Sequence, residues 1–391
     1  MSYRILSLDG GGAWAVLEVM ALMQLYDPQA PGHEVLGDFD LVAANSGGSL
    51  VLGGLLENMS LSGLYNLFLN EADRRSIFSP TTKWWDGLLH KVLGIGPKYS
   101  AANKLPALQH IMPRQAVNTL GDSANTVGGR SPHLLVVGFD YDRNRAVFFR
   151  SDDVGGPQWG TGAASDKVKA VEAIHASTNA PVNYFDAPAQ FHSQAGRYWD
   201  GGLTGCNNPV LPALVEAIQR QAKPEDLRVL SLGTGSVVLP LAAPGAKPEV
   251  YEAPRVDSGL VTDLEKLATS ILDDPPDAAT FIAHVLTGGG RFVKDPVVSS
   301  IVRMNPLIRP VGGPGTWALP GQMTPKQFAD IKDLDMDAVE QAQVQAIVDY
   351  AGIWLADEPV NQPIRLDGAS LAAEIGYDRF SAAKAAWGAI R

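Results

Sequence analysis

Short apolar runs alternate with glycine-rich turns over the first 60 residues. Residues 5–8 are mainly apolar and lead through Asp9 and three glycines into a stretch from 13 to 26 in which apolar residues recur at helical spacing. Residues 39–44 repeat the arrangement, pass through a serine-containing turn and continue into the apolar stretch 50–56. Apolar runs bounded by turn residues predict buried strands, and the helical period predicts a helix after each. The order predicts β-α-β units with a parallel sheet.

The same pattern extends over the rest of the chain. Further strands are expected at 134–139, 146–150 and 228–232, the last ending in Gly233-Thr234-Gly235, and helices at 259–272, 277–286, 325–354 and 381–390. Stretches 120–131 and 152–166 are rich in Gly, Ser, Asn and Asp and are predicted to be surface loops. We expect a three-layer α/β/α fold with a mainly parallel central sheet and a helical C-terminal portion.

The composition of the chain restricts the classes of protein to which it can belong. The chain has 391 residues, of which 46% are apolar, which is typical of a globular protein with a large core. Its net charge of −11 argues against nucleic acid as a partner and for apolar rather than electrostatic contact with lipid. The single cysteine, Cys206, excludes an intramolecular disulfide, and without a cysteine cluster structural zinc is not expected.

Neither a signal peptide nor a membrane span is predicted. The apolar run at the N-terminus is too short for a signal peptide and is followed at once by glycines. The longest stretch of low charge, 41–56, is interrupted by Asn45, Ser46 and four glycines and is shorter than the roughly 20 apolar residues that a spanning helix needs. We therefore expect a cytoplasmic protein.

The segment from 60 to 112 is irregular and rich in large apolar side chains, including Trp84 and Trp85. It is compatible with a cover over a site that binds a lipid interface. Aromatic side chains at helical spacing more often pack into a core, so an ordinary contribution to the core is the favoured interpretation.

Ser46 is the first candidate for a nucleophile. It stands at the turn between a predicted strand and a predicted helix, in Asn45-Ser46-Gly47-Gly48, with the small residues Ala44 and Gly48 two positions away on either side. A nucleophile elbow needs small residues there because the strand and helix backbones nearly touch. The pentapeptide alone is also compatible with a plain turn before a helix.

A serine hydroxyl needs a base to remove its proton. Asp200 is the candidate, because Gly201 and Gly202 follow it and let its carboxylate approach another main chain. Taken alone, Asp-Gly also fits a type I′ hairpin turn. If Asp200 were not the base, His175 and His192 would be the next residues to test.

The glycines after the first strand suit an oxyanion hole. Gly10, Gly11 and Gly12 precede a helix, so their N–H groups can lie unhindered near its positive end. A phosphate would suit the same loop. However, no Lys-Ser/Thr follows as in a P-loop, and the dinucleotide fingerprint G-x-G-x-x-G is absent.

Five blocks in this order resemble the patatin-like phospholipases, serine acyl hydrolases that use a Ser-Asp dyad. The blocks are Leu6-Ser7-Leu8-Asp9-Gly10-Gly11-Gly12, the serine turn from 39 to 48, Ala176-Ser177-Thr178-Asn179-Ala180-Pro181 with Tyr184-Phe185, Asp200-Gly201-Gly202 with Asn207-Asn208-Pro209, and residues 229–235. Weaker similarity continues through Tyr99-Ser100 and through 303–306.

The resemblance implies a role for each candidate. Ser46 would be the nucleophile and Asp200 the base, and the amides of Gly10, Gly11 and Gly12 would form the oxyanion hole, with no metal or cofactor. It further implies one acyl hydrolase domain over residues 1–357, followed by a helical tail over 358–391. Its substrate would be a lipid or other acyl ester, reached through transient contact with a membrane or micelle surface. The oligomeric state is left open.

Two departures from the family pattern affect the expected substrate. Ala44 replaces the first glycine of the elbow, which is a mild change. Ala13-Trp14-Ala15 replaces the usual x-Arg/Lys-Gly after the glycines, so a cation near the oxyanion loop is lost. Because Arg and Lys are the usual partners of phosphate oxygens, neutral esters become as plausible as phospholipids.

Two other functions remain compatible with the sequence. An acyltransferase would use the same serine and oxyanion hole but pass the acyl group to a thiol or alcohol. A catalytically silent protein would bind an acyl chain or a partner, with Trp14 blocking the site.

Overall fold

The computed structural model describes residues 2–81, 96–152, 161–162, 168–191, 194–259, 262–263, 266, 270, 275–289, 300–311, 316–359, 361, 364–365 and 374–391. Its central sheet has the strand order β10-β8-β1-β2-β3-β4-β5, and β7 also pairs with β3 and with β6. The first five strands of that order are parallel neighbours, whereas β4 and β7 run antiparallel to β3. The strands are β1 (Tyr3–Leu8), β2 (Leu41–Ala44), β3 (His133–Asp140), β4 (Arg145–Arg150), β5 (Thr161–Gly162), β6 (Ala189–Phe191), β7 (Gln194–Asp200), β8 (Leu227–Leu232) and β10 (Ile301–Met304).

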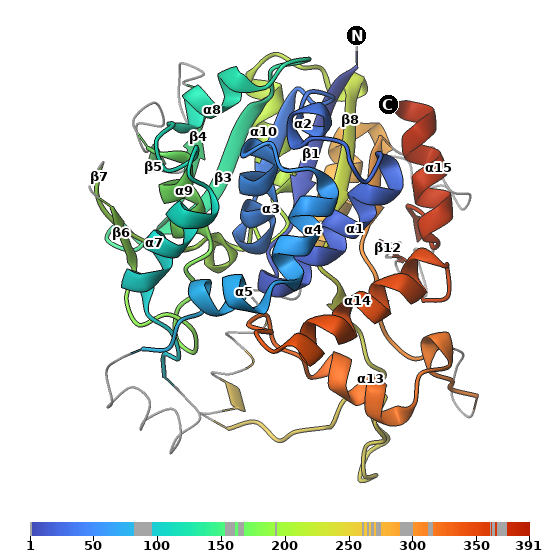
Figure 1. The fold of residues 1–391 in the computed structure, drawn as a ribbon. Helices are drawn as coiled ribbons and strands as arrows, with labels where there is room; N and C mark the ends of the chain where they lie inside the picture. Colours follow the sequence, from blue (N-terminus) through green and yellow to red (C-terminus); the bar gives the residue numbers. More distant parts are fainter. Residues whose placement is uncertain are drawn as a thin grey trace.

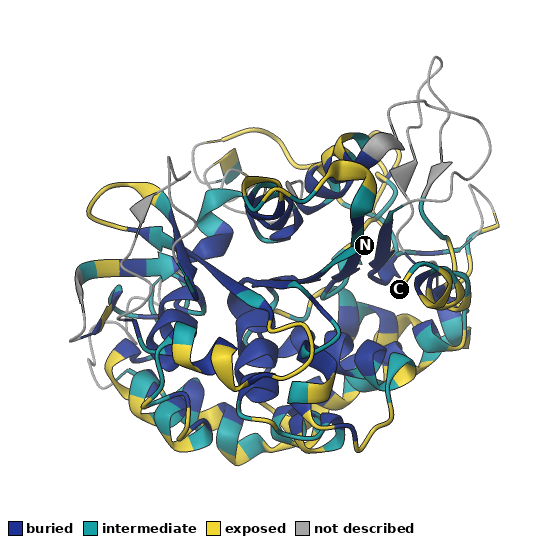
Figure 2. Ribbon diagram, turned by 90° about the horizontal axis from the view of Figure 1, so that it is seen from above, coloured by how far each residue is buried: buried dark blue, intermediate teal, exposed yellow. Residues whose placement is uncertain are grey.

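Helices cover both faces of this sheet (Figures 1 and 2). Ile5, Leu41 and Val229 of the strands pack on one side with α10 (Val210–Gln219) and α12 (Pro275–His284). Leu6 and Val42, their chain neighbours, face the other side and its larger group of helices. That group includes α1 (Val16–Leu25), α3 (Ser46–Leu56), α4 (Leu61–Leu69), α9 (Ala170–Ser177), α14 (Gln341–Leu355) and α15 (Phe380–Ile390). Burial on both faces is typical of a parallel sheet.

Shorter elements complete the described chain. The helices are α2 (Gly32–Leu36), α5 (Glu71–Ile77), α7 (Ala101–Ile111), α8 (Leu120–Thr126) and α13 (Pro325–Lys332), with 3-10 turns at Gly12–Ala15, Gly201–Thr204, Pro224–Asp226 and Pro320–Gln322 and a π-helical turn at Val285–Gly289. Two small sheets pair β9 (Ser236–Val237) with β11 (Leu307–Ile308) and β12 (Ile364–Arg365) with β13 (Glu374–Ile375).

The predicted α/β architecture and its mainly parallel sheet are confirmed. All five predicted strands are present within about two residues of their expected ends. The helix expected at 277–286 is α12 with the π-helical turn, and that expected at 381–390 is α15. Most of the helix expected at 259–272, most of the loop at 152–166, and both Trp84 and Trp85 lie outside the described residues.

Two predictions of local structure are wrong. Part of the predicted loop 120–131 is α8, because Thr119 and Asp122 form a capping box that stabilises a helix in a polar sequence. The single helix expected over 325–354 is two helices, α13 and α14. Thr324 caps the first and Glu340 the second, so each segment carries its own start signal.

Candidate active site

Ser46 lies at a sharp turn between the end of β2 and the start of α3. Its φ of 44° falls in the left-handed region, which costs a non-glycine residue energy and is frequent at functional sites. Its side chain lines a cavity, although the residue is only 6% exposed. A strained strand-to-helix turn with serine at its apex is the geometry of a nucleophile elbow.

Glycines next to Ser46 permit a very close approach between α3 and β1. A Cβ atom at Gly48 would lie 2.5 Å from the carbonyl oxygen of Leu8, and one at Gly47 would lie 2.7 Å from the amide nitrogen of Gly12. The Gly48 N–H also donates to the carbonyl of Asp9 at 2.9 Å. The elbow is therefore held directly against the glycine loop that follows β1.

Asp200 is the last residue of β7 and is followed by a 3-10 turn, so the hairpin interpretation of Asp200-Gly201 is wrong. Its carboxylate accepts a hydrogen bond from the Gly202 N–H at 2.8 Å. A Cβ atom at Gly201 would lie 2.3 Å from Oδ1 of Asn45. The aspartate loop thus lies against the elbow, although the two are far apart in the sequence.

The surroundings of Asp200 shift the pKa of its carboxyl group toward neutral pH. Burial raises the pKa of its carboxyl group to about 6. The neighbouring Ser46 and Asn45 side chains, the hydrogen bond from the Gly202 amide and the charge of Lys104 lower the pKa and partly oppose that effect. A buried carboxylate beside a serine hydroxyl, with a pKa near 6, is chemically suited to accept a proton.

The glycine loop borders the cavity beside Ser46 through Gly12. Gly10 is already engaged, since its N–H donates to the carbonyl of Asn207 at 2.8 Å. In the described part of the chain, the amides of Gly11, Gly12 and Gly47 make no hydrogen bond to backbone. Gly12 and Gly47 both line the cavity. Gly47 is the residue after the serine, a usual source of an oxyanion donor that the sequence pattern assigned only to the elbow.

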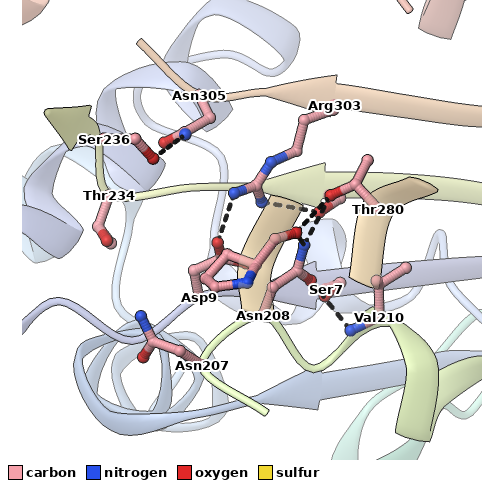
Figure 3. Close-up of polar contacts among 12 residues, drawn as sticks. Ser7, Asp9, Asn207, Asn208, Val210, Thr234, Ser236, Thr280, Arg303 and Asn305 are labelled. Carbon is pink, nitrogen blue, oxygen red and sulfur yellow. Dashed lines mark hydrogen bonds and ion pairs between the residues drawn. The ribbon is translucent and has the colours of Figure 1, made fainter. Parts of the chain in front are cut away.

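Buried polar contacts stabilise this loop (Figure 3). Arg303 of β10 donates to Oδ2 of Asp9 at 2.6 Å and to the hydroxyl of Ser231 at 2.9 Å. The Asp9 N–H donates to Glu18, and the Thr234 hydroxyl donates to the Gly10 carbonyl, both at 2.6 Å. Burial raises the pKa of Asp9 to about 6 even though Arg303 lowers it. The loop is therefore fixed before any ligand arrives.

An apolar cleft adjoins the cavity beside Ser46. The two share Gly12, Leu50, Ile77 and Phe78, and the cleft continues between α4, α5 and α7 along Leu67, Phe68, Ile111 and Met112. Trp14 lines neither of them; its ring lies against Gly235. A Trp14 side chain that blocks the site therefore has no support in the described structure.

Two further side chains bear on the chemistry. Lys104, which no sequence motif indicated, is fully buried and lines the cavity. His175 is buried too, and desolvation together with the charge of Lys104 lowers its pKa well below the ordinary value. His192 lies outside the described residues. Among the described residues, no group of three or more His, Cys, Asp or Glu side chains could hold a metal ion.

The fold and the serine turn define a class of α/β proteins with a nucleophile elbow, and a sequence comparison gives the family. The model of the patatin-like phospholipases matches residues 6–214, more than half of the chain. The chain therefore belongs to the patatin-like phospholipase family, a family of lipid acyl hydrolases. A search of curated protein sequences found no match.

The similarity to solved structures is distant. VipD from Legionella pneumophila matches at 12% identity with a TM-score of 0.35, over 89% of this chain and 67% of VipD. The type III effector protein ExoU matches at 12% identity with a TM-score of 0.28, over 90% of this chain and 53% of ExoU. The chain thus spans about half the length of ExoU, and the family assignment rests on the sequence match.

Among the helices of the described residues, none combines the length and the apolar character that crossing a bilayer requires.

Proposed function

We propose that this protein is a serine lipid acyl hydrolase in which Ser46 is the nucleophile and Asp200 is the general base. The main support is that Asp200 is buried, that burial raises its pKa to about 6, and that the Ser46 side chain lies close enough to lower this pKa. The strained φ of Ser46 and the adjoining glycine loop support the same roles.

The reaction would proceed through an acyl-enzyme. Asp200 accepts the Ser46 proton as the serine oxygen attacks the ester carbonyl, and the carbonyl π pair moves onto oxygen. The amides of Gly11, Gly12 and Gly47 donate to that oxyanion, each contributing roughly 3 kcal/mol to transition-state stabilisation. The intermediate expels the alcohol, which takes the proton from Asp200, and water then cleaves the acyl-enzyme by the same path.

The apolar cleft is the proposed site for the acyl chain. It opens from the cavity beside Ser46 and is lined mainly by Leu, Ile, Phe and Met side chains, which favour burial of a hydrocarbon chain. Phospholipids and neutral esters are both candidate substrates, and transient contact with a membrane or micelle surface remains a prediction.

The proposed catalytic unit extends beyond the residues matched by the family. Arg303 and Thr234 hold the glycine loop, and the Met336 carbonyl accepts a hydrogen bond from the Ala13 N–H at 2.9 Å. These contacts support one domain over residues 1–357. The C-terminal segment 358–391 adds α15 to its core.

Hydrolysis of a short-chain p-nitrophenyl ester tests the proposed roles. Ser46→Ala and Asp200→Asn should each lower kcat by at least about a thousandfold, because members of a catalytic unit act together. Ser381→Ala and Asp349→Asn, which change exposed residues on α15 and α14, should retain full activity. Circular dichroism would establish that each variant is folded.

Undiminished hydrolysis by folded Ser46→Ala would contradict the proposal. Activity retained in Asp200→Asn alone would reassign the base. An inactive wild-type protein would favour a lipid-binding role, and release of product faster in the presence of an added alcohol would indicate acyl transfer.

A further inference from the structure

Lys104 occupies an unusual environment for a lysine. It lies on α7 with none of its surface exposed, and it lines the same cavity as Ser46 and Gly12. Its Nζ donates to the His175 carbonyl at 3.3 Å and to Oδ1 of Asn179 at 3.5 Å, and it lies 4.1 Å from the centre of the Phe185 ring. None of these partners carries a full negative charge. A buried ammonium is costly unless a counter-charge compensates it.

Asp200 supplies the negative charge that acts on Lys104. Asn179 connects the two, since its side chain accepts from Lys104 while its backbone carbonyl accepts from the Asp200 N–H at 3.0 Å. Burial lowers the pKa of Lys104 well below its ordinary value, the charge of Asp200 opposes that lowering, and Lys104 in turn lowers the pKa of Asp200. Each of the two charges therefore favours the ionised form of the other residue, as in an ion pair whose members are not in direct contact.

Other titratable groups near Lys104 do not replace Asp200 in this role. His175 on α9 is buried, and its lowered pKa keeps the ring neutral at neutral pH. Arg74 on α5, a helix that packs on α7, donates to the carbonyls of Phe68 and Val339. Asp186 accepts a hydrogen bond from the Ala101 N–H at the start of α7.

Taking the proposed function as given, we propose that Lys104 is a positioning residue whose ammonium group is the counter-charge of the catalytic aspartate. It keeps Asp200 ionised and ready to accept the Ser46 proton. When that proton moves to Asp200, the serine oxygen bonds to the ester carbon and the negative charge moves to the carbonyl oxygen. Lys104 lines the cavity in which this transfer occurs. The negative charge therefore stays close to the Lys104 ammonium group throughout the step.

The proposal also accounts for a departure from the family pattern. The cation that usually follows the glycine loop is missing, because Ala13, Trp14 and Ala15 stand there. Lys104 supplies a positive charge to the same cavity from α7. The charge of Lys104 acts on Asp200, which is the proposed base, rather than at the outer surface of the site.

The pH dependence of kcat/KM tests this role. Lys104→Met and Lys104→Gln remove the charge, so Asp200 should hold its proton to higher pH, and the acid limb of the profile should move up by about one pH unit or more. Lys104→Arg keeps the charge and should keep the acid limb near that of the wild type. Lys384→Met, an exposed position on α15, is the control and should leave the profile unchanged. An acid limb that stays in place in folded Lys104→Met and Lys104→Gln would overturn the proposal.

A double-mutant cycle measures the coupling between Lys104 and Asp200 through protein stability and needs no activity assay. At pH 8, Lys104→Met should lower Tm more in the wild-type background than in Asp200→Asn, where the counter-charge is already gone. Equal losses of Tm in the two backgrounds would overturn the proposal. If the wild-type protein failed to hydrolyse esters, the proposed function would fall, whereas this cycle would still decide whether Lys104 and Asp200 are coupled.

Discussion

At the scale of single residues, the site depends on groups whose surroundings alter their ordinary chemistry. Ser46 adopts a left-handed φ, and Asp200 is a carboxyl group with a raised pKa. The sequence selected both as candidates, because glycines mark the places where a side chain can stand at a sharp turn. Lys104 could not be identified in this way. A single lysine in Ala-Ala-Asn-Lys-Leu has no local feature that distinguishes a buried position from an exposed one.

The pKa of Asp200 predicts a specific dependence of activity on pH. Burial raises this pKa to about 6, so the carboxyl group is protonated below that pH and cannot accept the serine proton. The value of kcat/KM should therefore rise as the pH rises through about 6 and then level off. Measurements between pH 4.5 and 8 on protein shown to be folded would check this. A profile that stays flat down to pH 5 would mean that the base is an ordinary carboxylate or another group.

At the scale of elements, the short apolar runs predicted the strands well because a parallel sheet is buried on both faces. β10 was missed because its four residues include the charged Arg303, whose partner Asp9 is almost 300 positions away. α8 was missed because its helix depends on caps rather than on an apolar face. Long-range pairing and capping are therefore the two features that apolar periodicity does not reveal.

The contact between α3 and β1 can be tested with a single methyl group. Gly48→Ala would place a Cβ atom 2.5 Å from the Leu8 carbonyl oxygen, so α3 must move, and we expect a loss of stability of about 1–3 kcal/mol together with a loss of hydrolysis. Gly352→Ala on α14 is the matched control, because nothing lies within 4 Å of its added methyl. It should gain about 0.5–1 kcal/mol. Urea denaturation measures both, and equal stabilities of the two variants would contradict this view of the contact.

At the scale of the whole molecule, residues beyond the family match complete the core and the site. Arg303 donates a hydrogen bond to Asp9, the residue that precedes the glycine loop. Trp387 of α15 stacks on Phe39, which precedes β2 in the chain, with ring centres 5.9 Å apart. Phe380 of the same helix meets Trp354 edge-on, at 4.8 Å. The sequence predicted α15 as a helix in a tail. Its packing could not be predicted, because its apolar face gives no indication of which surface it covers.

The packing of α15 predicts that its buried face stabilises the entire domain. Trp387 is 1% exposed, so Trp387→Ala leaves a large cavity and should cost about 3–5 kcal/mol. Lys384→Ala, on the exposed side of the same helix, should change stability by less than about 0.5 kcal/mol. Thermal unfolding followed by circular dichroism would compare the two. A Tm for Trp387→Ala close to that of Lys384→Ala would show that α15 is dispensable for the fold.

Covalent labelling measures whether the Ser46 hydroxyl is activated as a nucleophile. A fluorophosphonate probe followed by peptide mass spectrometry should give one adduct, on the peptide that contains Ser46, and Ser46→Ala should give none. Asp200→Asn should label far more slowly, since no base removes the serine proton. Folded wild-type protein that stays unlabelled, or that carries the adduct on a different residue, would show that Ser46 is not the activated nucleophile.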